Sequence, residues 1–128
     1  MYPLARKGTL IGLPGQGTHS FSEPPNNWES DNAIDIAVPN GTKVLAVHGG
    51  TIGSQIGPLD SSNPRFAGNR LHLVTRNNEF YYAHLEKLSV KAGQRVRKGQ
   101  LLGYSGSANG VAHLHFASKH GDPRELIK

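Results

Sequence analysis

Histidine and aspartate side chains on three predicted strands are the groups in this chain best suited to chemistry. His113 and His115 are separated by one residue, and side chains at that spacing on a strand point to the same face. Asp35 alternates with isoleucines in a second stretch, and His84 follows aromatic residues in a third. Two neighbouring imidazoles can bind one metal ion, or one can bind it while the other transfers protons.

Each of these residues also has a purely structural interpretation. Asp35 could lie on the solvated face of an edge strand, His84 could pack among aromatic rings, and a single His-x-His pair is weak evidence. Together they are more informative, because each lies on a predicted strand beside a Gly-containing turn. Catalytic zinc takes three protein ligands and leaves one position for water. The chain has no Cys, so any metal must be held by His, Asp or Glu.

The elements that must position these residues are short strands. The chain of 128 residues contains 16 Gly and 8 Pro, which suits frequent turns around one modest core. Alternating apolar residues predict strands at 33–38, 44–47, 70–75, 80–85, 100–103 and 111–118, a small-residue loop at 105–110 and a helical turn at 123–127. We therefore expect an all-β, antiparallel fold of the two-sheet sandwich or barrel-sandwich kind. A single domain would cover 1–128, with an irregular N-terminal segment (1–30), a core (31–118) and a tail (119–128).

The net charge of +5 favours an anionic partner such as a wall polymer. The densest basic cluster is either that surface or simply a solvated face; it comprises Lys87, Lys91, Arg95, Arg97 and Lys98. No nucleic-acid-binding motif is present, so we expect no nucleic-acid partner. No apolar run reaches the ~20 residues needed to span a bilayer. Residues 1–8 lack the apolar core of a secretory signal, and we expect a monomer.

Four stretches carry a resemblance to a known family: IDIAVPNGTKVLAVHGG (34–50), YYAHL (81–85), VKAGQRVRKGQLLGYSGSANG (90–110) and AHLHF (112–116). Their order and spacing resemble the motifs of the lysostaphin-type (LytM-like) zinc endopeptidases, over about 31–116. The resemblance implies an antiparallel β fold, one zinc ion, and hydrolysis of peptide bonds in peptidoglycan stems or cross-bridges. It also implies an extracellular location at the cell wall, as part of a phage particle, a lysis protein or a domain of a secreted enzyme.

The resemblance also implies roles for individual residues. Asp35 and His115 would be zinc ligands, and His84 and His113 would be the two uncoordinated catalytic histidines. Asn69 matches a small polar position near the family's cleft, where it would contact substrate. Tyr82 would line the groove or donate to the oxyanion, unless it is part of the core.

One position departs from the family pattern. Asp31 stands four residues before Asp35, where the family has its first His ligand. His19 could replace that ligand if the segment containing Pro24 and Pro25 folds the chain back. Alternatively Asp31 binds, giving a harder, carboxylate-rich site, or the site is degenerate and the protein is a non-catalytic wall-binding module. We predict His19, because imidazole suits zinc and a dead site has no need of two catalytic imidazoles.

The remaining histidines are expected to be structural. His48 precedes a Gly-Gly turn, His72 alternates with leucines and faces away from the core, and His120 lies in the polar tail. Residues 93–100 resemble the turn-and-strand element of biotinyl or lipoyl carrier domains. The modified Lys of that class commonly lies in a Met-Lys-Met or Asp-Lys motif, and this chain has neither, which argues against a carrier function.

Overall fold

The computed structural model describes residues 1–16, 19, 27–59 and 67–128. In these residues the chain is mostly strand, as the alternation of apolar residues predicts. The elements, in order, are β1 (Thr9–Gly12), α1 (Trp28–Asp31), β2 (Ala33–Ala37), β3 (Lys43–Leu45), β4 (Gly50–Ile52), β5 (Gly57–Pro58), β6 (Asn69–Val74), β7 (Glu79–Leu88), β8 (Arg95–Val96), β9 (Leu101–Ala108), β10 (Val111–Ser118) and the 3₁₀ helix η3 (Pro123–Ile127).

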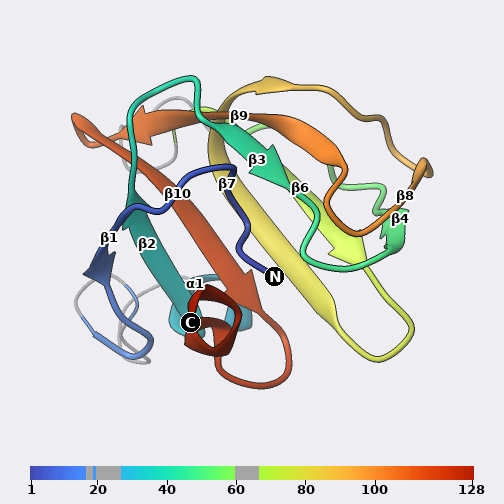
Figure 1. Ribbon diagram of the computed structural model, residues 1–128, viewed down its shortest axis with the longest axis horizontal. Coiled ribbons are helices and arrows are strands. Elements are labelled where there is room, and N and C mark those ends of the chain that lie inside the picture. The colour runs from blue at the N-terminus through green and yellow to red at the C-terminus, as the bar shows by residue number, and fades with distance from the viewer. Residues whose placement is uncertain (17–18, 20–26, 60–66) are drawn as a thin grey trace.

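The strands of the described residues form one antiparallel sheet in the order β1-β2-β10-β9-β7-β6-β4-β8. Strand β3 pairs with β9, β5 pairs with β6, and β10 also pairs directly with β7. Figure 1 shows β3 and β9 crossing in front of β10, β7 and β6, so one continuous sheet folds over to make two layers. The all-β antiparallel prediction is confirmed, and the two expected layers share a single hydrogen-bonded network.

The core lies between these layers and is built from the apolar residues of each alternating strand. Its largest fully buried side chains include Tyr82, Phe116, Ile34, Ile36, Leu71, Leu73, Leu85, Leu102 and Leu114. A smaller cluster on the opposite side of the sheet joins Ala33, Tyr81, Ala83 and Ala117, with Trp28 and Leu59 packed against it. The second cluster leaves mostly small residues on that face, which makes room there for polar side chains.

Two of the predicted boundaries are wrong. The segment 1–30 was expected to be irregular, yet it contains β1, which pairs with β2, and the start of α1. The proposed loop at 105–110 is largely strand, because β9 continues to Ala108 before Asn109 and Gly110 turn the chain into β10. The small residues at 105–110 do not mark a loop but allow neighbouring strands to pack closely. A Cβ at Gly106 would lie 2.7 Å from the carbonyl oxygen of His84. The terminal helical turn is confirmed as η3.

Strand β10 is the centre of the functional face. His115 pairs with Asp35 of β2 on one side and with Ala83 of β7 on the other. Directly paired residues in antiparallel strands project from the same face. Leu114 and Phe116 are fully buried in the core, so His113 and His115 project together from the other side. The predicted shared face of the two histidines is confirmed.

A bulge in β7 changes the direction of His84. Asn69 of β6 pairs with Leu85, but Leu71 pairs with Tyr82, so two residues of β7 oppose Arg70 alone. His84 takes up the extra residue with φ of 66°, in the left-handed region that non-glycine residues rarely adopt. Strict alternation would place His84 on the same face as Tyr82. The bulge instead turns it to the face of His115, while Leu85 returns to the core.

The same alternation corrects the expectation for Tyr82. Its ring is fully buried and packs on Phe116, with centroids 5.1 Å apart. Its hydroxyl donates to the carbonyl of Leu45 (3.0 Å) and accepts from the backbone N–H of Val47 (3.1 Å). Tyr82 therefore joins β7 to the chain after β3 and does not line a groove; the neighbouring Tyr81 faces the functional side.

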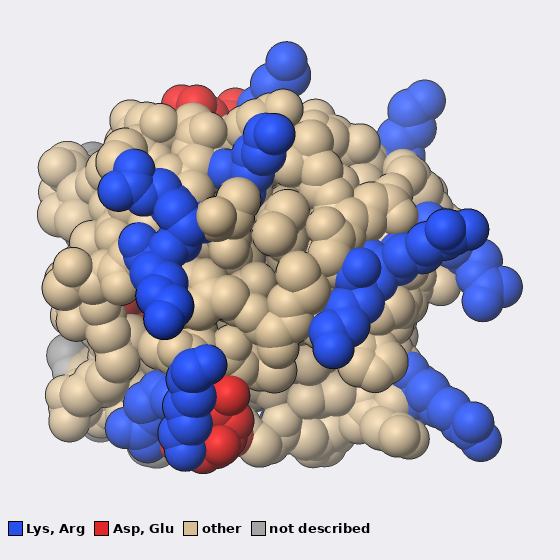
Figure 2. Space-filling view, in the orientation of Figure 1, with Lys and Arg blue, Asp and Glu red and all other residues tan. Residues whose placement is uncertain are grey.

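Basic side chains are spread over the surface. Figure 2 shows Lys and Arg side chains distributed over the face that carries β3 and β9, several of them side by side, with few acidic groups among them. The five cations of the densest sequence cluster, residues 87–98, are all exposed. None of the helices in the described ranges has the length and apolar character needed to cross a bilayer.

We predict that Tyr82→Phe destabilises the fold. The substitution removes one donor and one acceptor and leaves buried backbone groups unpaired, which costs about 1–3 kcal/mol in free energy of unfolding. Urea denaturation measures this loss, with Tyr104→Phe as the control because no hydrogen bond joins the Tyr104 hydroxyl to the described residues. Equal stabilities of the two variants would contradict the core role of Tyr82.

Candidate functional site

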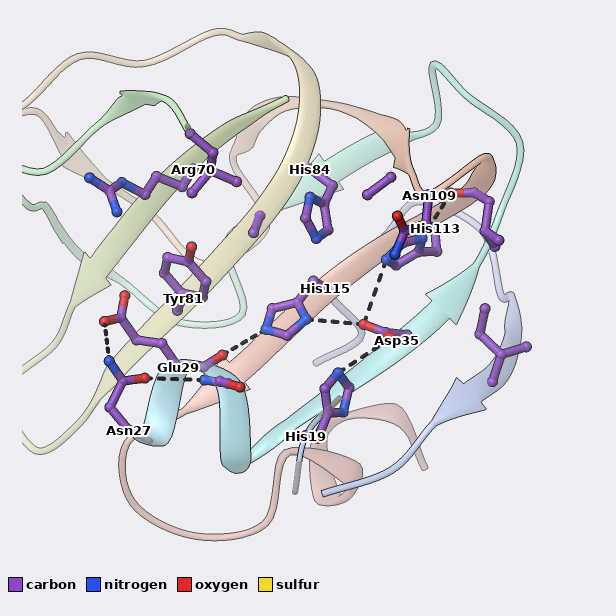
Figure 3. Close-up of a pocket in the computed structure, with 16 residues that line it drawn as sticks. His19, Asn27, Glu29, Asp35, Arg70, Tyr81, His84, Asn109, His113 and His115 are labelled. Atoms are coloured by element: carbon purple, nitrogen blue, oxygen red, sulfur yellow. Dashed lines mark hydrogen bonds and ion pairs between the residues drawn. The ribbon is translucent and has the colours of Figure 1, made fainter. Parts of the chain in front are cut away.

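A cleft of about 450 Å³ opens on the face of β2, β10 and β7 opposite the core. Four histidines and one aspartate lie along its floor, and Figure 3 shows them between Asn109 at one end and Arg70 with Tyr81 at the other. All five, His19, Asp35, His84, His113 and His115, are residues predicted from the sequence to bind the metal or to act in catalysis. Segments from both ends of the chain therefore meet in one concave site.

Asp35 is the centre of this group. One carboxylate oxygen lies 3.3 Å from Nε2 of His19, and the other lies 3.1 Å from Nδ1 of His115. Burial alone would raise the pKa of Asp35, but hydrogen bonds and charge from His115 and His19 outweigh it and hold the pKa well below its usual range. Burial likewise acts to lower the pKa of His19, yet Asp35 raises it overall. His19, Asp35 and His115 place one ligand atom each within 4.8 Å of the others and could hold a metal ion.

Backbone carbonyls fix the orientation of all four imidazoles. In each ring one nitrogen contacts a carbonyl oxygen, which can only accept, so that nitrogen carries the proton. The four contacts are His19 Nδ1 to Leu13 (3.2 Å), His84 Nδ1 to Ala67 (2.7 Å), His113 Nδ1 to Val111 (2.9 Å) and His115 Nε2 to Glu29 (2.6 Å). In the neutral rings the other nitrogen is unprotonated. For His19 and His115 this nitrogen is the one facing Asp35, as expected of metal-binding histidines.

His84 and His113 form a pair beside this group. Their ring centroids are 5.1 Å apart, and Nε2 of His113 lies 3.7 Å from Asp35. Burial, helped by the charge of His115, lowers the pKa of His84 to about 4. The ring is therefore neutral at neutral pH, with an unprotonated nitrogen able to accept a proton.

Helix α1 supports the site in a way that the sequence did not reveal. Glu29 contributes its main-chain carbonyl to His115, while its carboxylate bonds Nε2 of His72 at 2.7 Å. Trp28 packs on His72 and Tyr81, and Asn27 caps the helix by accepting from Ser30. A helix of one turn is not stable alone, so these contacts fix the carbonyl that orients His115. The Asn cap and the acidic first turn were the available sequence signals.

The remaining predicted residues lie around the cleft or outside it. Asn69 is half-buried and donates to the carbonyl of Leu85 (3.1 Å), and it does not line the cleft. Asp31 is buried at the end of α1, outside the group that could hold a metal. His48 and His120 are exposed, and His72 faces away from the core, as expected, but is buried beneath α1. The segment with Pro24 and Pro25, expected to fold the chain back, lies outside the described residues.

Gly12 allows β1 to approach Asp35 closely. It pairs with Asp35 at an irregularity in β1, and a Cβ at this position would lie 2.7 Å from the carboxylate. Leu13, which orients His19, follows directly. The absence of a side chain at Gly12 thus brings the His19 segment beside β2.

Comparison with known proteins yields a consistent set of relatives. The model of peptidase family M23 matches residues 29–125. The peptidoglycan DD-endopeptidase ShyA of Vibrio cholerae is 36% identical over 90 residues, covering 66% of this chain and 19% of the relative. The glycyl-glycine endopeptidase ALE-1 of Staphylococcus capitis is 34% identical over 129 residues, covering 86% of this chain and 34% of the relative. This chain thus spans about a third or less of these proteins.

The fold has solved counterparts as well. The catalytic domain of the antimicrobial peptidase lysostaphin from Staphylococcus simulans superimposes with a TM-score of 0.67 and 25% identity. The match covers 95% of this chain and 91% of that domain. The likeness therefore extends over nearly the whole of both chains.

We predict that Gly12→Ala weakens divalent metal binding about 10- to 100-fold, the range seen when support behind a ligand is disturbed. The new methyl group must displace Asp35 or β1. Competition with a chromophoric chelator measures the affinity. Gly49→Ala is the control, because its Cβ would meet no atom closer than 3.6 Å. Equal affinities in the two variants would show that the close approach at Gly12 is unimportant for the site.

Proposed function

Because the chain belongs to peptidase family M23, we propose that it is a zinc-dependent endopeptidase that hydrolyses peptide bonds in peptidoglycan stems or cross-bridges. The observation that carries this proposal is the convergence of Asp35 and four oriented imidazoles in one cleft. Peptidoglycan endopeptidases among the relatives support the choice of substrate. The proposed place of action is the cell wall.

His19, Asp35 and His115 are the proposed zinc ligands. Two imidazole nitrogens and one carboxylate form a donor set that zinc prefers, with a coordination position left for water or substrate. The contacts of His19 with Asp35 support this set over the one containing Asp31. Zinc bound there would polarise the scissile carbonyl and make water more acidic.

His84 and His113 are the proposed proton carriers. Each donates its Nδ1 proton to a backbone carbonyl, so Nε2 is free to take a proton from the attacking water. The oxygen of that water forms the new bond to the carbonyl carbon. As the C–N bond breaks, the protonated imidazole returns the proton to the leaving amine. Because the rings of His84 and His113 lie side by side, a proton taken up by either one stays close to the bond that is cleaved.

We predict that the wild-type chain binds one zinc ion and that His19→Ala abolishes stoichiometric binding, whereas Asp31→Asn retains it. Mass spectrometry of the metal content after dialysis gives the stoichiometry, and circular dichroism shows that the variants fold. Retention by His19→Ala with loss by Asp31→Asn would instead assign the carboxylate-rich ligand set. A folded wild type without affinity for zinc would favour the alternative, a non-catalytic wall-binding module.

We also predict that His113→Ala and His84→Ala each lower kcat about 10²- to 10⁴-fold, the usual contribution of a positioned acid or base, while zinc stoichiometry is kept. Release of amino groups from purified peptidoglycan measures the rate. His48→Ala is the matched control, because His48 is exposed and outside the cleft. Full activity of His113→Ala, or of wild type after removal of zinc by a chelator, would disprove the mechanism.

A further inference from the structure

Arg70 is a cation in the cleft to which the proposed reaction assigns no role. It lies on β6 opposite the bulge formed by Ala83 and His84, and it is half-buried. Figure 3 places it beyond Tyr81, on the side of the four histidines away from Asn109. Arg70 therefore enters the cleft from β6 at the same irregularity that turns His84 into the site.

The carboxylates that line the cleft are already engaged. Glu29 bonds His72 at 2.7 Å and lies 3.4 Å from the amide nitrogen of Asn27. Asp35 is held between His19 and His115. Among the residues that the structure describes, no carboxylate lies within ion-pair distance of Arg70. The cation nearest the end of the cleft thus has no anionic partner in this part of the chain.

Tyr81 lies in the same part of the cleft as Arg70 and does not neutralise it. The charge of Arg70 acts to lower the pKa of the Tyr81 hydroxyl, but burial outweighs it. Burial raises the pKa of Tyr81 to about 12, so the phenol stays uncharged at neutral pH. The planar fork of the Arg70 guanidinium matches the geometry of a carboxylate.

We propose that Arg70, which lines the cleft together with Tyr81, binds a free carboxylate of the peptide substrate at this end of the cleft. The inference rests on the proposed endopeptidase function and specifies its substrate class. Stem peptides of peptidoglycan carry free carboxylates along their length, whereas a bridge made only of glycine carries none between its ends. Arg70 therefore selects acidic stem peptides over glycine bridges.

The test compares native peptidoglycan with the same material after its carboxylates have been converted to amides by carbodiimide and ammonia. Sedimentation binding is measured in the His113→Ala background, and amino-group release in the wild-type background. Arg70→Gln should weaken binding and lower kcat/KM on native peptidoglycan on the order of 10- to 100-fold, the value of a charged hydrogen bond. On amidated peptidoglycan, chains with and without Arg70→Gln should behave alike.

Three further variants keep the outcome decisive. Arg70→Lys keeps the charge but loses the planar fork, so its binding and kcat/KM on native peptidoglycan should fall between those of wild type and Arg70→Gln. Tyr81→Phe should weaken binding of native peptidoglycan only slightly. Arg76→Gln, at an exposed turn outside the cleft, is the charge-matched control and should change neither measurement. If Arg70→Gln does not fold, Arg70→Lys decides the question.

Equal behaviour of Arg70→Gln and wild type on native peptidoglycan would overturn the proposal, as would an equal loss on both materials. Failure of the endopeptidase function is distinguishable, since wild type would then release no amino groups from either material. The binding comparison in the His113→Ala background would still test Arg70 in that case.

Discussion

The mutual orientation of Asp35, His19 and His115 is the constraint on which the site depends. In their neutral forms the two imidazoles direct unshared electron pairs at a carboxylate, and the three groups repel one another. A cation between them, or protons on the rings, relieves this repulsion. For the same reason Asp35 raises the pKa of His19, and His19 helps to lower the pKa of Asp35. The carbonyls of Leu13 and Glu29 bind the outer N–H groups and prevent the rings from turning to relieve this repulsion. Such an arrangement is costly for an ordinary core and natural for a metal site.

The bulge at His84 is the second feature that the site requires. A residue in the left-handed region costs of order 1–3 kcal/mol and persists only where its surroundings fix it. Here the carbonyl of Ala67 holds the ring, and Gly68 packs so closely that a Cβ would lie 3.0 Å from the His84 backbone. The strained residue is thus one that a regular strand would have pointed into the core. Its position beside His113 gives the distortion a functional explanation.

Period-two alternation predicted much of this structure and failed where the strands are irregular. It placed Asp35 opposite the isoleucines and His113 beside His115, because β2 and β10 are regular there. Alternation did not decide whether Tyr82 faces the groove or the core. It would put Tyr82 and His84 on the same face, because it gives no sign of the bulge at His84. It also missed the role of Glu29, which acts through a main-chain carbonyl that any residue type possesses. Backbone roles and bulges depend on the pairing of distant strands, which one sequence does not display.

The geometry around α1 gives a physical reason why His19 and Asp31 differ in their suitability as ligands. Residues 28–31 form a turn of helix whose carbonyl at Glu29 already supports His115 from behind. Asp31, at the end of that turn, is buried, and one of its carboxylate oxygens has no hydrogen-bond partner among the described residues; it lies outside the group formed by His19, Asp35 and His115. The chain that follows β1 approaches Asp35 instead, and its close passage beside this carboxylate depends on Gly12. In this chain the imidazole beside Asp35 comes from the segment after β1 and not from α1. The Asp at position 31, where the family pattern has a His, is therefore accompanied by an imidazole from another segment, while α1 keeps the carbonyl that orients His115.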